Sequence, residues 1–270
     1  MKKLLGGVLA ALFWVWAGAA WALVPAGAGL DYQAHQPGYN AGALYEQGFQ
    51  PVAASGQLVA TQWTEFIDSQ GNWGARGQVL NNGNSRVWFA EIDVDLLDKN
   101  SGRKLASKFS FVNGDAARTS SGVVTDTTIA PGDTVTFDIL YTGLAASQVK
   151  AGAKHFSWYN YAGQPTHAEL NLSQFTQYTY RGEMAARGTV QNSGWDWAYF
   201  AQVRADAFDV AGNYIGGDYA FVDGQTATIN TVTTGTAISP GGSAGFDIRW
   251  TGIPASDVAW VKTHLGWKEK

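Results

Sequence analysis

The chain has no cysteine, and its 270 residues include only two methionines and four histidines. Without cysteine it forms no disulfide and carries no lipid attached through an N-terminal cysteine, although an oxidising compartment would permit disulfides. Four scattered histidines offer little for metal binding or acid–base chemistry. No nucleophile–base pair or pair of carboxylates recurs either, so we expect a non-enzymatic protein without a metal or other cofactor.

Charge is also sparse. Asp, Glu, Lys and Arg make up 15% of the residues, the formal net charge is −4, and no run of lysine and arginine occurs. Nucleic acids and anionic lipid surfaces attract basic proteins, so an acidic chain of this kind is unsuited to both. We therefore expect neither nucleic acid nor a lipid surface as a partner.

Helical patterns are missing as well, because no segment after residue 22 keeps apolar residues at the i, i+3, i+4 spacing of an amphipathic helix. The 33 glycines and 13% aromatic residues instead favour strands and turns. Residues 23–58 are rich in Gly, Ala and Gln and poor in aliphatic residues. This segment is predicted to be an extended N-terminal arm that precedes an all-β protein.

The first 22 residues resemble a secretory signal peptide. Two lysines are followed by an apolar run from Leu4 to Trp16 and by the small-x-small site Ala20-Trp21-Ala22. We predict a mature chain that begins near Leu23, is exported to the periplasm or the cell surface of a bacterium, and does not insert into a membrane. An uncleaved membrane anchor is the alternative, because residues 4–24 are nearly long enough to cross a bilayer.

The remainder of the chain is a duplication. Arg-Gly-x-Val-x-Asn-x-Gly begins at Arg76 and again at Arg187, and Phe-Asp-Ile begins at Phe137 and again at Phe246. The offset falls from 111 (187 − 76) to 109 (246 − 137), as expected from single-residue deletions in loops. This period fits a duplicated domain rather than a solenoid unit. Other equivalent pairs are Phe89 and Phe200, Asp98 and Asp209, Ile129 and Ile238, His155 and His264, and Trp158 and Trp267.

Each copy consists of short alternating runs separated by turn sequences. Residues 90–96 and 201–207 place an apolar residue at every second position, which predicts strands with one buried and one wet face. Several such strands with frequent turns are typical of a sandwich. We predict two tandem immunoglobulin-like antiparallel β-sandwich domains at 59–161 and 171–270, joined by a linker at 162–170.

The order of these motifs resembles the FxLYD-type domains of exported bacterial and archaeal proteins. The likeness covers 73–143 and 184–252, where a G-x-V-x-N-x-G motif precedes an alternating strand, an Asp before a Gly turn, and a Pro-Gly before an F-x-I strand. The naming motif is degraded, because 94–98 and 205–209 keep its Asp but lack the leading Phe and the Tyr. The resemblance implies an immunoglobulin-like fold and an envelope location, and that family has no general activity.

Two motifs that carry chemistry in other proteins are interpreted as structural here. The run Gly241-Gly242-Ser243-Ala244-Gly245 matches the hydrolase nucleophile elbow, but a strand rather than a helix is predicted after it, so the match is assigned to chance. His155 and His264 each lie three residues before a tryptophan. They are interpreted as polar residues at the edge of a strand rather than as ligands or bases, because no acidic or histidine partner recurs.

A group of aspartates in the first copy is interpreted in the same way. Asp93, Asp95 and Asp98 suggest a calcium loop, which takes several oxygen ligands from one segment. Alternation, however, places Asp93 and Asp95 on a solvated strand face, and the second copy has Arg204 in the position of Asp93. Asp98 and its equivalent Asp209 are expected to cap turns through side-chain to backbone hydrogen bonds.

Two tryptophans distinguish the second copy. Trp88 and Tyr199 follow the alternation of the buried face and are predicted to lie in the cores. Trp195 and Trp197 have Asn84 and Arg86 as counterparts, and a core position does not accept such replacements. These two tryptophans are therefore expected to be partly exposed, where they pack on the first domain, stack on a sugar ring or anchor a protein partner.

Taken as a whole, the sequence predicts an exported binding, adhesion or envelope-assembly protein whose partner is another envelope or surface protein. A carbohydrate-binding protein that uses Trp195 and Trp197 is the alternative, supported by the 12 tryptophans of the chain.

Overall fold

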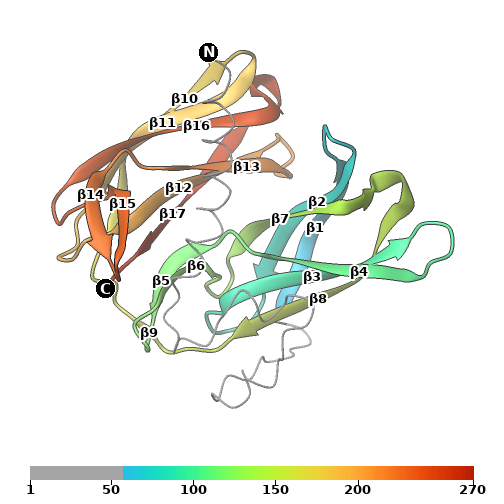
Figure 1. The fold of residues 1–270 in the computed structure, drawn as a ribbon, viewed down its shortest axis with the longest axis horizontal. Helices are drawn as coiled ribbons and strands as arrows, with labels where there is room; N and C mark the ends of the chain where they lie inside the picture. Colours follow the sequence, from blue (N-terminus) through green and yellow to red (C-terminus); the bar gives the residue numbers. More distant parts are fainter. Residues whose placement is uncertain (1–56) are drawn as a thin grey trace, which may run out of the picture. The chain divides into compact units, whose positions relative to one another are not determined.

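The computed structural model describes residues 57–270, so the predicted signal peptide and nearly all of the predicted arm lie outside the described residues. The described chain consists almost entirely of antiparallel strands (Figure 1), which confirms the all-β prediction. Two short 3₁₀ turns, η3 (Ala146–Gln148) and η4 (Ala255–Asp257), occupy equivalent places in the two copies. Every ladder between named strands stays within one copy, and the copies are called the first and second repeat below.

The first repeat contains two three-stranded sheets with the orders β1-β2-β7 and β4-β3-β8, and a small sheet with the order β6-β5-β9. Strand β9 lies in the segment predicted as the linker. The bounds are β1 (Leu58–Ile67), β2 (Asn72–Asn81), β3 (Trp88–Asp98), β4 (Lys104–Phe111), β5 (Asp115–Thr119), β6 (Val124–Thr128), β7 (Thr134–Ala145), β8 (Val149–Tyr159) and β9 (Gly163–Gln164).

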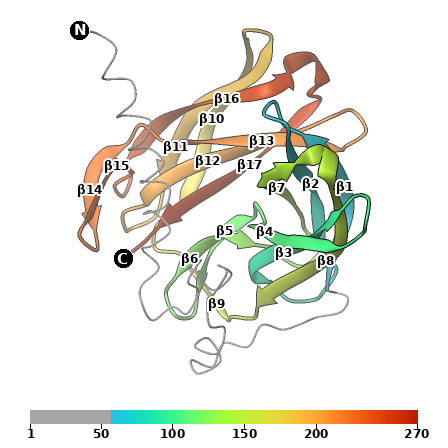
Figure 2. The ribbon, with the colours of Figure 1, turned by 45° about the vertical axis from the view of Figure 1, so that its right-hand side comes forward.

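The second repeat has the equivalent sheets β10-β11-β16 and β13-β12-β17, and a hairpin, β14-β15, replaces the small sheet (Figure 2). The bounds are β10 (Leu170–Tyr180), β11 (Glu183–Asn192), β12 (Tyr199–Phe208), β13 (Tyr214–Phe221), β14 (Gln225–Ile229), β15 (Val232–Ala237), β16 (Ser243–Pro254) and β17 (Trp260–Lys268). Because β16 is a strand that begins at Ser243, the interpretation of the nucleophile-elbow match as chance is confirmed.

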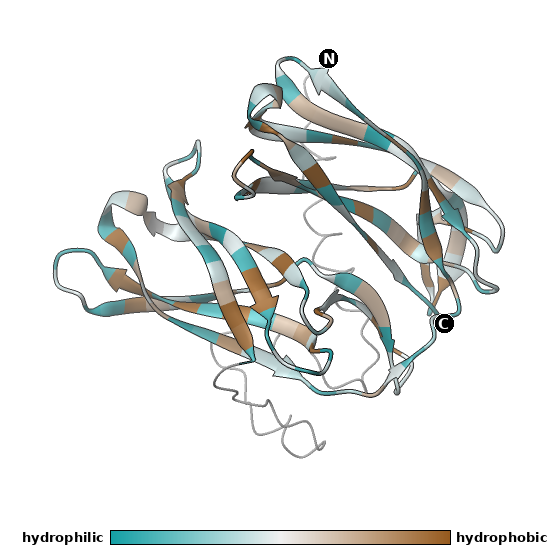
Figure 3. Ribbon diagram, turned by 180° about the vertical axis from the view of Figure 1, so that it is seen from behind, coloured by the Kyte–Doolittle hydropathy of each residue, from teal (hydrophilic) through white to brown (hydrophobic). Residues whose placement is uncertain are grey.

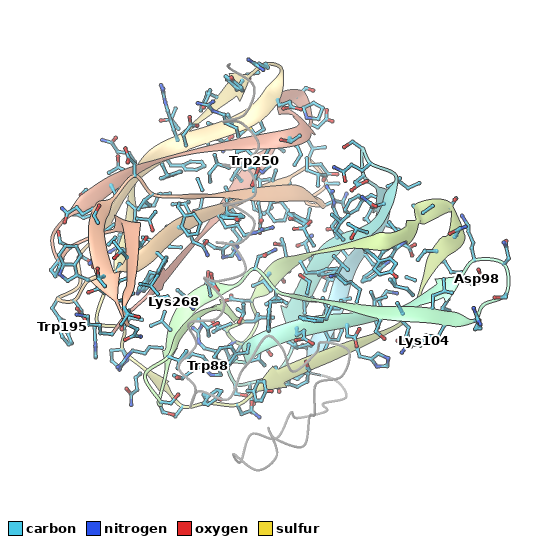
Figure 4. The ribbon with its side chains drawn as sticks, in the orientation of Figure 1. Trp88, Asp98, Lys104, Trp195, Trp250 and Lys268 are labelled. Atoms are coloured by element: carbon cyan, nitrogen blue, oxygen red, sulfur yellow. The ribbon has the colours of Figure 1, made fainter. Side chains whose placement is uncertain are left out.

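Each repeat encloses a core between its two larger sheets. Apolar and polar segments alternate along the strands (Figure 3), and the apolar ones form a main cluster in the first repeat, a main cluster almost entirely from the second, and a small third cluster around Tyr199. Trp88 is 1% exposed and Tyr199 is 3% exposed, as predicted for buried aromatic residues. Trp250 is also buried, between the sheets of the second repeat (Figure 4).

The repeated glycine is required by a close approach of two strands. Strand β1 has a bulge between Ala60 and Gln62, and a Cβ on Gly77 would lie 2.0 Å from the Gln62 carbonyl oxygen. The same holds in the second repeat, where a Cβ on Gly188 would lie 2.0 Å from the carbonyl oxygen of Gln174. No side chain fits there, so the motif keeps glycine at both positions.

The repeated asparagine forms hydrogen bonds to backbone groups of several segments near the start of the next strand. Asn192 is fully buried, and its Nδ2 donates to the carbonyls of Asp196 at 2.8 Å and Ile238 at 3.1 Å. Its Oδ1 accepts from the backbone amides of Gly194 at 3.0 Å and Glu169 at 3.1 Å. Asn81 is buried in the same role in the first repeat. The motif therefore encodes architecture.

Replacing Asn192 by alanine should lower the free energy of unfolding by about 1–3 kcal/mol, because buried backbone groups lose their hydrogen bonds. Asn171→Ala is the matched control, since Asn171 is exposed and donates only to the Ser193 hydroxyl. Its cost should stay within about 0.5 kcal/mol. Urea unfolding of the two variants measures the difference, and equal effects would mean that the buried amide has no special role.

Candidate functional site

Trp195 lies in the loop between β11 and β12 and is 71% exposed. Figure 4 shows it at the margin of the second repeat. The loop is held by the buried Asn192, which binds the backbone on both sides of Trp195 through Gly194 and Asp196. A large apolar side chain on a fixed loop is typical of a contact residue, because little conformational freedom is lost when a partner binds.

His167 supports the Trp195 ring from one side. The ring centroids are 4.2 Å apart with an interplanar angle of 33°, and the Trp195 amide donates to the His167 carbonyl at 2.9 Å. The His167 amide in turn donates at 2.8 Å to Oε1 of Glu269. This buried carboxylate also accepts from the Ala168 amide at 2.8 Å and from the Trp267 indole at 3.1 Å. The C-terminus therefore fixes the segment on which Trp195 rests.

Trp197 has a different environment. It is half-buried, its ring lies 6.2 Å from that of Tyr199 at an angle of 28°, and it packs on a small cluster of Tyr199, Ile229 and Ala237. Trp197 thus covers the β14-β15 hairpin, while Trp195 projects outward. Its first-repeat counterpart, Arg86, donates to the Thr128 hydroxyl at 2.8 Å on β6.

Both tryptophans have the partial exposure that the comparison of the copies predicted, and their role in binding stays a prediction. Sequence reasoning missed His167 and Glu269. Glu269 has Asn160 at the equivalent position of the first repeat, so no repeated pattern marks it. For His167 a sequence clue did exist. It lies just before β10, whose first residue pairs with the last residue of β11, so it is close to the loop that carries Trp195.

Two surface recesses of the described chain lie away from Trp195 and Trp197. Two shallow recesses in the described chain are lined by residues of the β12-β13 and β16-β17 connections or by residues near Gly217, and neither includes Trp195 or Trp197. Among residues 57–270, no three His, Asp or Glu side chains are grouped in a way that would hold a metal ion. No helix within this range is long and apolar enough to cross a membrane.

A polar cluster lies where the two repeats meet. We call the outer face of β1-β2-β7 or β10-β11-β16 the front face, and that of β4-β3-β8 or β13-β12-β17 the back face. The front face of the first repeat contacts the back face of the second. At its centre Arg204 donates to Asp138 and to Asp206, both at 2.8 Å, and the Thr136 hydroxyl donates to Asp206 at 2.5 Å. Tyr214 adds a hydrogen bond to Asp138 at 2.5 Å.

Burial shapes the charges in this cluster. The Asp206 side chain is fully buried, and burial raises the pKa of its carboxyl against the opposing effect of Arg204. Burial alone would lower the pKa of Arg204, but the Asp206 carboxylate raises it above its ordinary value. Burial also raises the pKa of Tyr214, with Asp138 adding to the effect. The cluster therefore holds a cation between two carboxylates from different repeats.

Further polar contacts surround this centre. His264 is 4% exposed, lies within β17 and pairs with Asp115 at 2.9 Å, so the predicted position at the edge of a strand is wrong for this histidine. Gln62 forms a two-way pair with the backbone of Tyr214, at 2.8 and 3.1 Å. Further cross-repeat contacts join Gln78 to Gly212, Arg76 to Ile215, Lys262 to Thr134, Gln202 to Asp126, Lys268 to Val124 and Arg118 to Glu269.

The aspartates on the β3 and β12 strands therefore differ between the repeats. Asp95 is 20% exposed and pairs with Lys104 at 2.5 Å, as expected near solvent, whereas its equivalent Asp206 is buried. The prediction that the outer face of this strand is exposed to solvent is thus wrong for β12 of the second repeat. Asp98 and Asp209 accept hydrogen bonds from backbone amides of their own turns, which confirms their predicted capping role.

No protein-family model matches this sequence, and a search of curated proteins finds no match. Among solved structures, a transglutaminase of red sea bream is 8% identical with a TM-score of 0.22, and the match covers 88% of this chain and 32% of that one. An exo-chitosanase variant of Amycolatopsis orientalis in complex with PNP-β-D-glucosamine is 11% identical with a TM-score of 0.23, covering 77% and 25%. This chain spans about a third and a quarter of those two proteins, and likenesses at such scores bear on neither fold nor function.

Proposed function

We propose that this chain is an exported, non-enzymatic binding protein of the bacterial envelope that holds a partner protein through Trp195. Two tandem immunoglobulin-like repeats related to the FxLYD type form the framework, and the N-terminal 22 residues direct export to the periplasm or the cell surface. Adhesion and envelope assembly are the roles that suit such a framework, because it presents fixed loops at the ends of its strands.

The exposure of Trp195 carries this proposal. A tryptophan that is 71% exposed has no role in the core, and its loop is fixed by Asn192, His167 and Glu269. Tryptophan is the residue type most enriched among those that dominate binding energy at protein interfaces. The first repeat has the exposed Asn84 at this position, so the feature belongs to the second repeat rather than to the shared framework.

Carbohydrate binding is the second candidate, and the same ring supports it. His167 covers one side of the Trp195 indole, and the large exposed fraction leaves surface on which a sugar can stack. Stacking of a ligand on an aromatic face combines apolar burial with the ring's own electrostatics. The two candidates use one site and differ in the partner.

Trp195→Ala should abolish most of the binding while leaving the fold intact. Interface aromatics often contribute 2 kcal/mol or more, so we expect affinity for the partner to fall by roughly 30-fold. The free energy of unfolding should change by less than about 1 kcal/mol, because an exposed side chain is removed. Binding is measured with envelope extract and with a glycan array, and the partner that responds separates the two candidates.

Trp260→Ala is the matched control, because Trp260 is 45% exposed and lies on β17, where it stacks on Phe208. It should bind as the wild type does. Trp197→Ala should reduce stability more than binding, since Trp197 packs on Tyr199. Unchanged binding by the Trp195 variant to every partner that the wild type captures would overturn the proposed site.

A further inference from the structure

The recess near Gly217 lies at the contact between the two repeats. It has a volume of about 230 Å³ and is lined by Arg76 and Asp138 of the first repeat and by residues 216–218 and 250–253 of the second. Because both repeats contribute charged side chains to its walls, the recess is a feature of the full chain. It does not include Trp195, so it is separate from the site proposed above.

Arg76 brings to the recess a cation that forms no ion pair within the described chain. Its cross-strand neighbour Asp138 instead accepts from Arg204 at 2.8 Å. The Arg76 guanidinium lies over the Phe66 ring, 4.1 Å from its centroid, and its Nη1 donates to the Ile215 carbonyl. Its buried Nε has no acceptor among the described residues. A guanidinium with unused donors is suited to a carboxylate, because its planar fork matches the two carboxylate oxygens.

Asp218 brings a carboxylate from the second repeat. It is half-buried, its Oδ1 accepts from the Tyr219 amide at 2.8 Å, and no cationic side chain of the described chain forms an ion pair with it. Burial raises the pKa of its carboxyl, although the Tyr219 amide and Arg204 act in the opposite direction. The first repeat has Lys108 at this strand position. A partly desolvated carboxylate of this kind is stabilised by a cation such as an ammonium group.

Two glycines allow charged groups to approach this recess closely. A Cβ on Gly216 would lie 2.8 Å from Nη1 of Arg76, and a Cβ on Gly217 would lie 2.2 Å from a carboxylate oxygen on β12. The first repeat has Ala106 and Ser107 at the equivalent strand positions. The Gly-Gly-Asp sequence of β13 is thus a feature of the second repeat alone, and it leaves two successive wall positions without a side chain.

We propose that this recess binds a small zwitterionic α-amino acid, with the ligand carboxylate on Arg76 and the ligand ammonium group on Asp218. Both side chains lack an ionic partner in the described chain, and one ligand that carries both charges supplies the two partners together. A simple amine or a simple carboxylate would satisfy only one of them. The small volume of the recess suits a molecule with few heavy atoms, and the bound amino acid would join the two repeats.

Calorimetric titration of the full chain tests the proposal with glycine, L-alanine, alaninamide and propionate. Glycine and L-alanine should bind with a stoichiometry of one to one. Alaninamide lacks the carboxylate and propionate lacks the ammonium group, so each should bind about tenfold more weakly than L-alanine, or weaker still, through the loss of charge-assisted hydrogen bonds. The proposal is overturned if neither amino acid binds, or if alaninamide or propionate binds as tightly as L-alanine.

Two variants assign the ligand charges to the walls. Asp218→Asn should weaken L-alanine binding about tenfold and leave the affinity for propionate unchanged, whereas Arg76→Gln should weaken it similarly and leave the affinity for alaninamide unchanged. Titrations at high probe concentration reach the weaker analogues. Arg187→Gln, at the equivalent strand position of the second repeat, and Asp223→Asn are the matched controls, because both residues are exposed and lie outside the recess.

Urea unfolding verifies that the variants are folded. Asp218→Asn is the decisive one, because the Asp218 side chain accepts only from the neighbouring amide and an amide side chain of the same shape keeps that acceptor. The controls should bind L-alanine as the wild type does. If a folded Asp218→Asn variant keeps its full affinity for L-alanine, or weakens the binding of all probes equally, the proposed orientation of the ligand is wrong.

Discussion

Replacing Asp206 by alanine is expected to lower the free energy of unfolding of the full chain by roughly 3–5 kcal/mol, the usual cost of removing one partner from a buried ion pair. Arg204 would keep only Asp138 as an ionic partner, and the Thr136 hydroxyl would lose the carboxylate to which it donates at 2.5 Å. His264 would keep Asp115 but would lose its second carboxylate neighbour, since its Nε2 lies 3.7 Å from Asp206. Urea unfolding of wild type and variant measures the loss.

The duplication supplies the control for this experiment. Asp95→Ala changes the equivalent residue of the first repeat, whose partner Lys104 is 54% exposed. An exposed ion pair contributes about 0–1 kcal/mol, so this variant should be nearly neutral. Asp206→Ala should also be mild in the isolated second repeat, because water solvates Arg204 and His264 there. Equal losses for the two aspartates in the full chain would mean that burial at the contact contributes nothing.

Phe246→Ala should cost about 3–5 kcal/mol in the isolated second repeat, residues 166–270, through lost burial and a cavity. Phe246 is 6% exposed, lies directly over Gly188, and stacks on Phe175 with the ring centroids 6.5 Å apart. We expect this fragment to unfold cooperatively, because its core cluster takes only Val124 and the partly buried Ala116 from outside the second repeat.

Phe221→Ala is the matched control in the same fragment. Phe221 is 45% exposed on β13 and makes an edge contact with Tyr219. Removing it should cost about 1 kcal/mol or less. If the wild-type fragment shows no cooperative transition in urea, the two repeats share one folding unit and the expectation for the fragment is wrong.

The alternation of single strands was enough to predict most of the fold. The apolar positions of β7 and β16 fill the cores through Phe137 and Phe246, and the Gly turns follow Asp98 and Asp209 as expected. The repeated Asn81 and Asn192 were visible as a motif, but their buried hydrogen bonds were not, because polar residues in a turn motif look alike whether buried or exposed.

The contact between the two repeats could not be predicted from the sequence. An alternating strand shows which side chains share a face, but it does not show whether water or another sheet covers that face. Asp95 and Asp206 have the same local pattern, and only the second is buried. The change from Asp93 to Arg204 was a usable signal, because it removes an anion at the point where Asp138 of the first repeat approaches.

The polar character of this contact has a consequence for the order of events during synthesis. The first repeat is complete before β10 is made, because the chain grows from its N-terminus. Until the second repeat has been synthesised, Gln62, Arg76 and Asp138 on the front face of the first repeat are exposed to solvent. The nascent chain therefore exposes hydrophilic rather than apolar groups there. Association of the two finished repeats is thus the last step, and a delay in it leaves soluble surfaces instead of aggregation-prone ones.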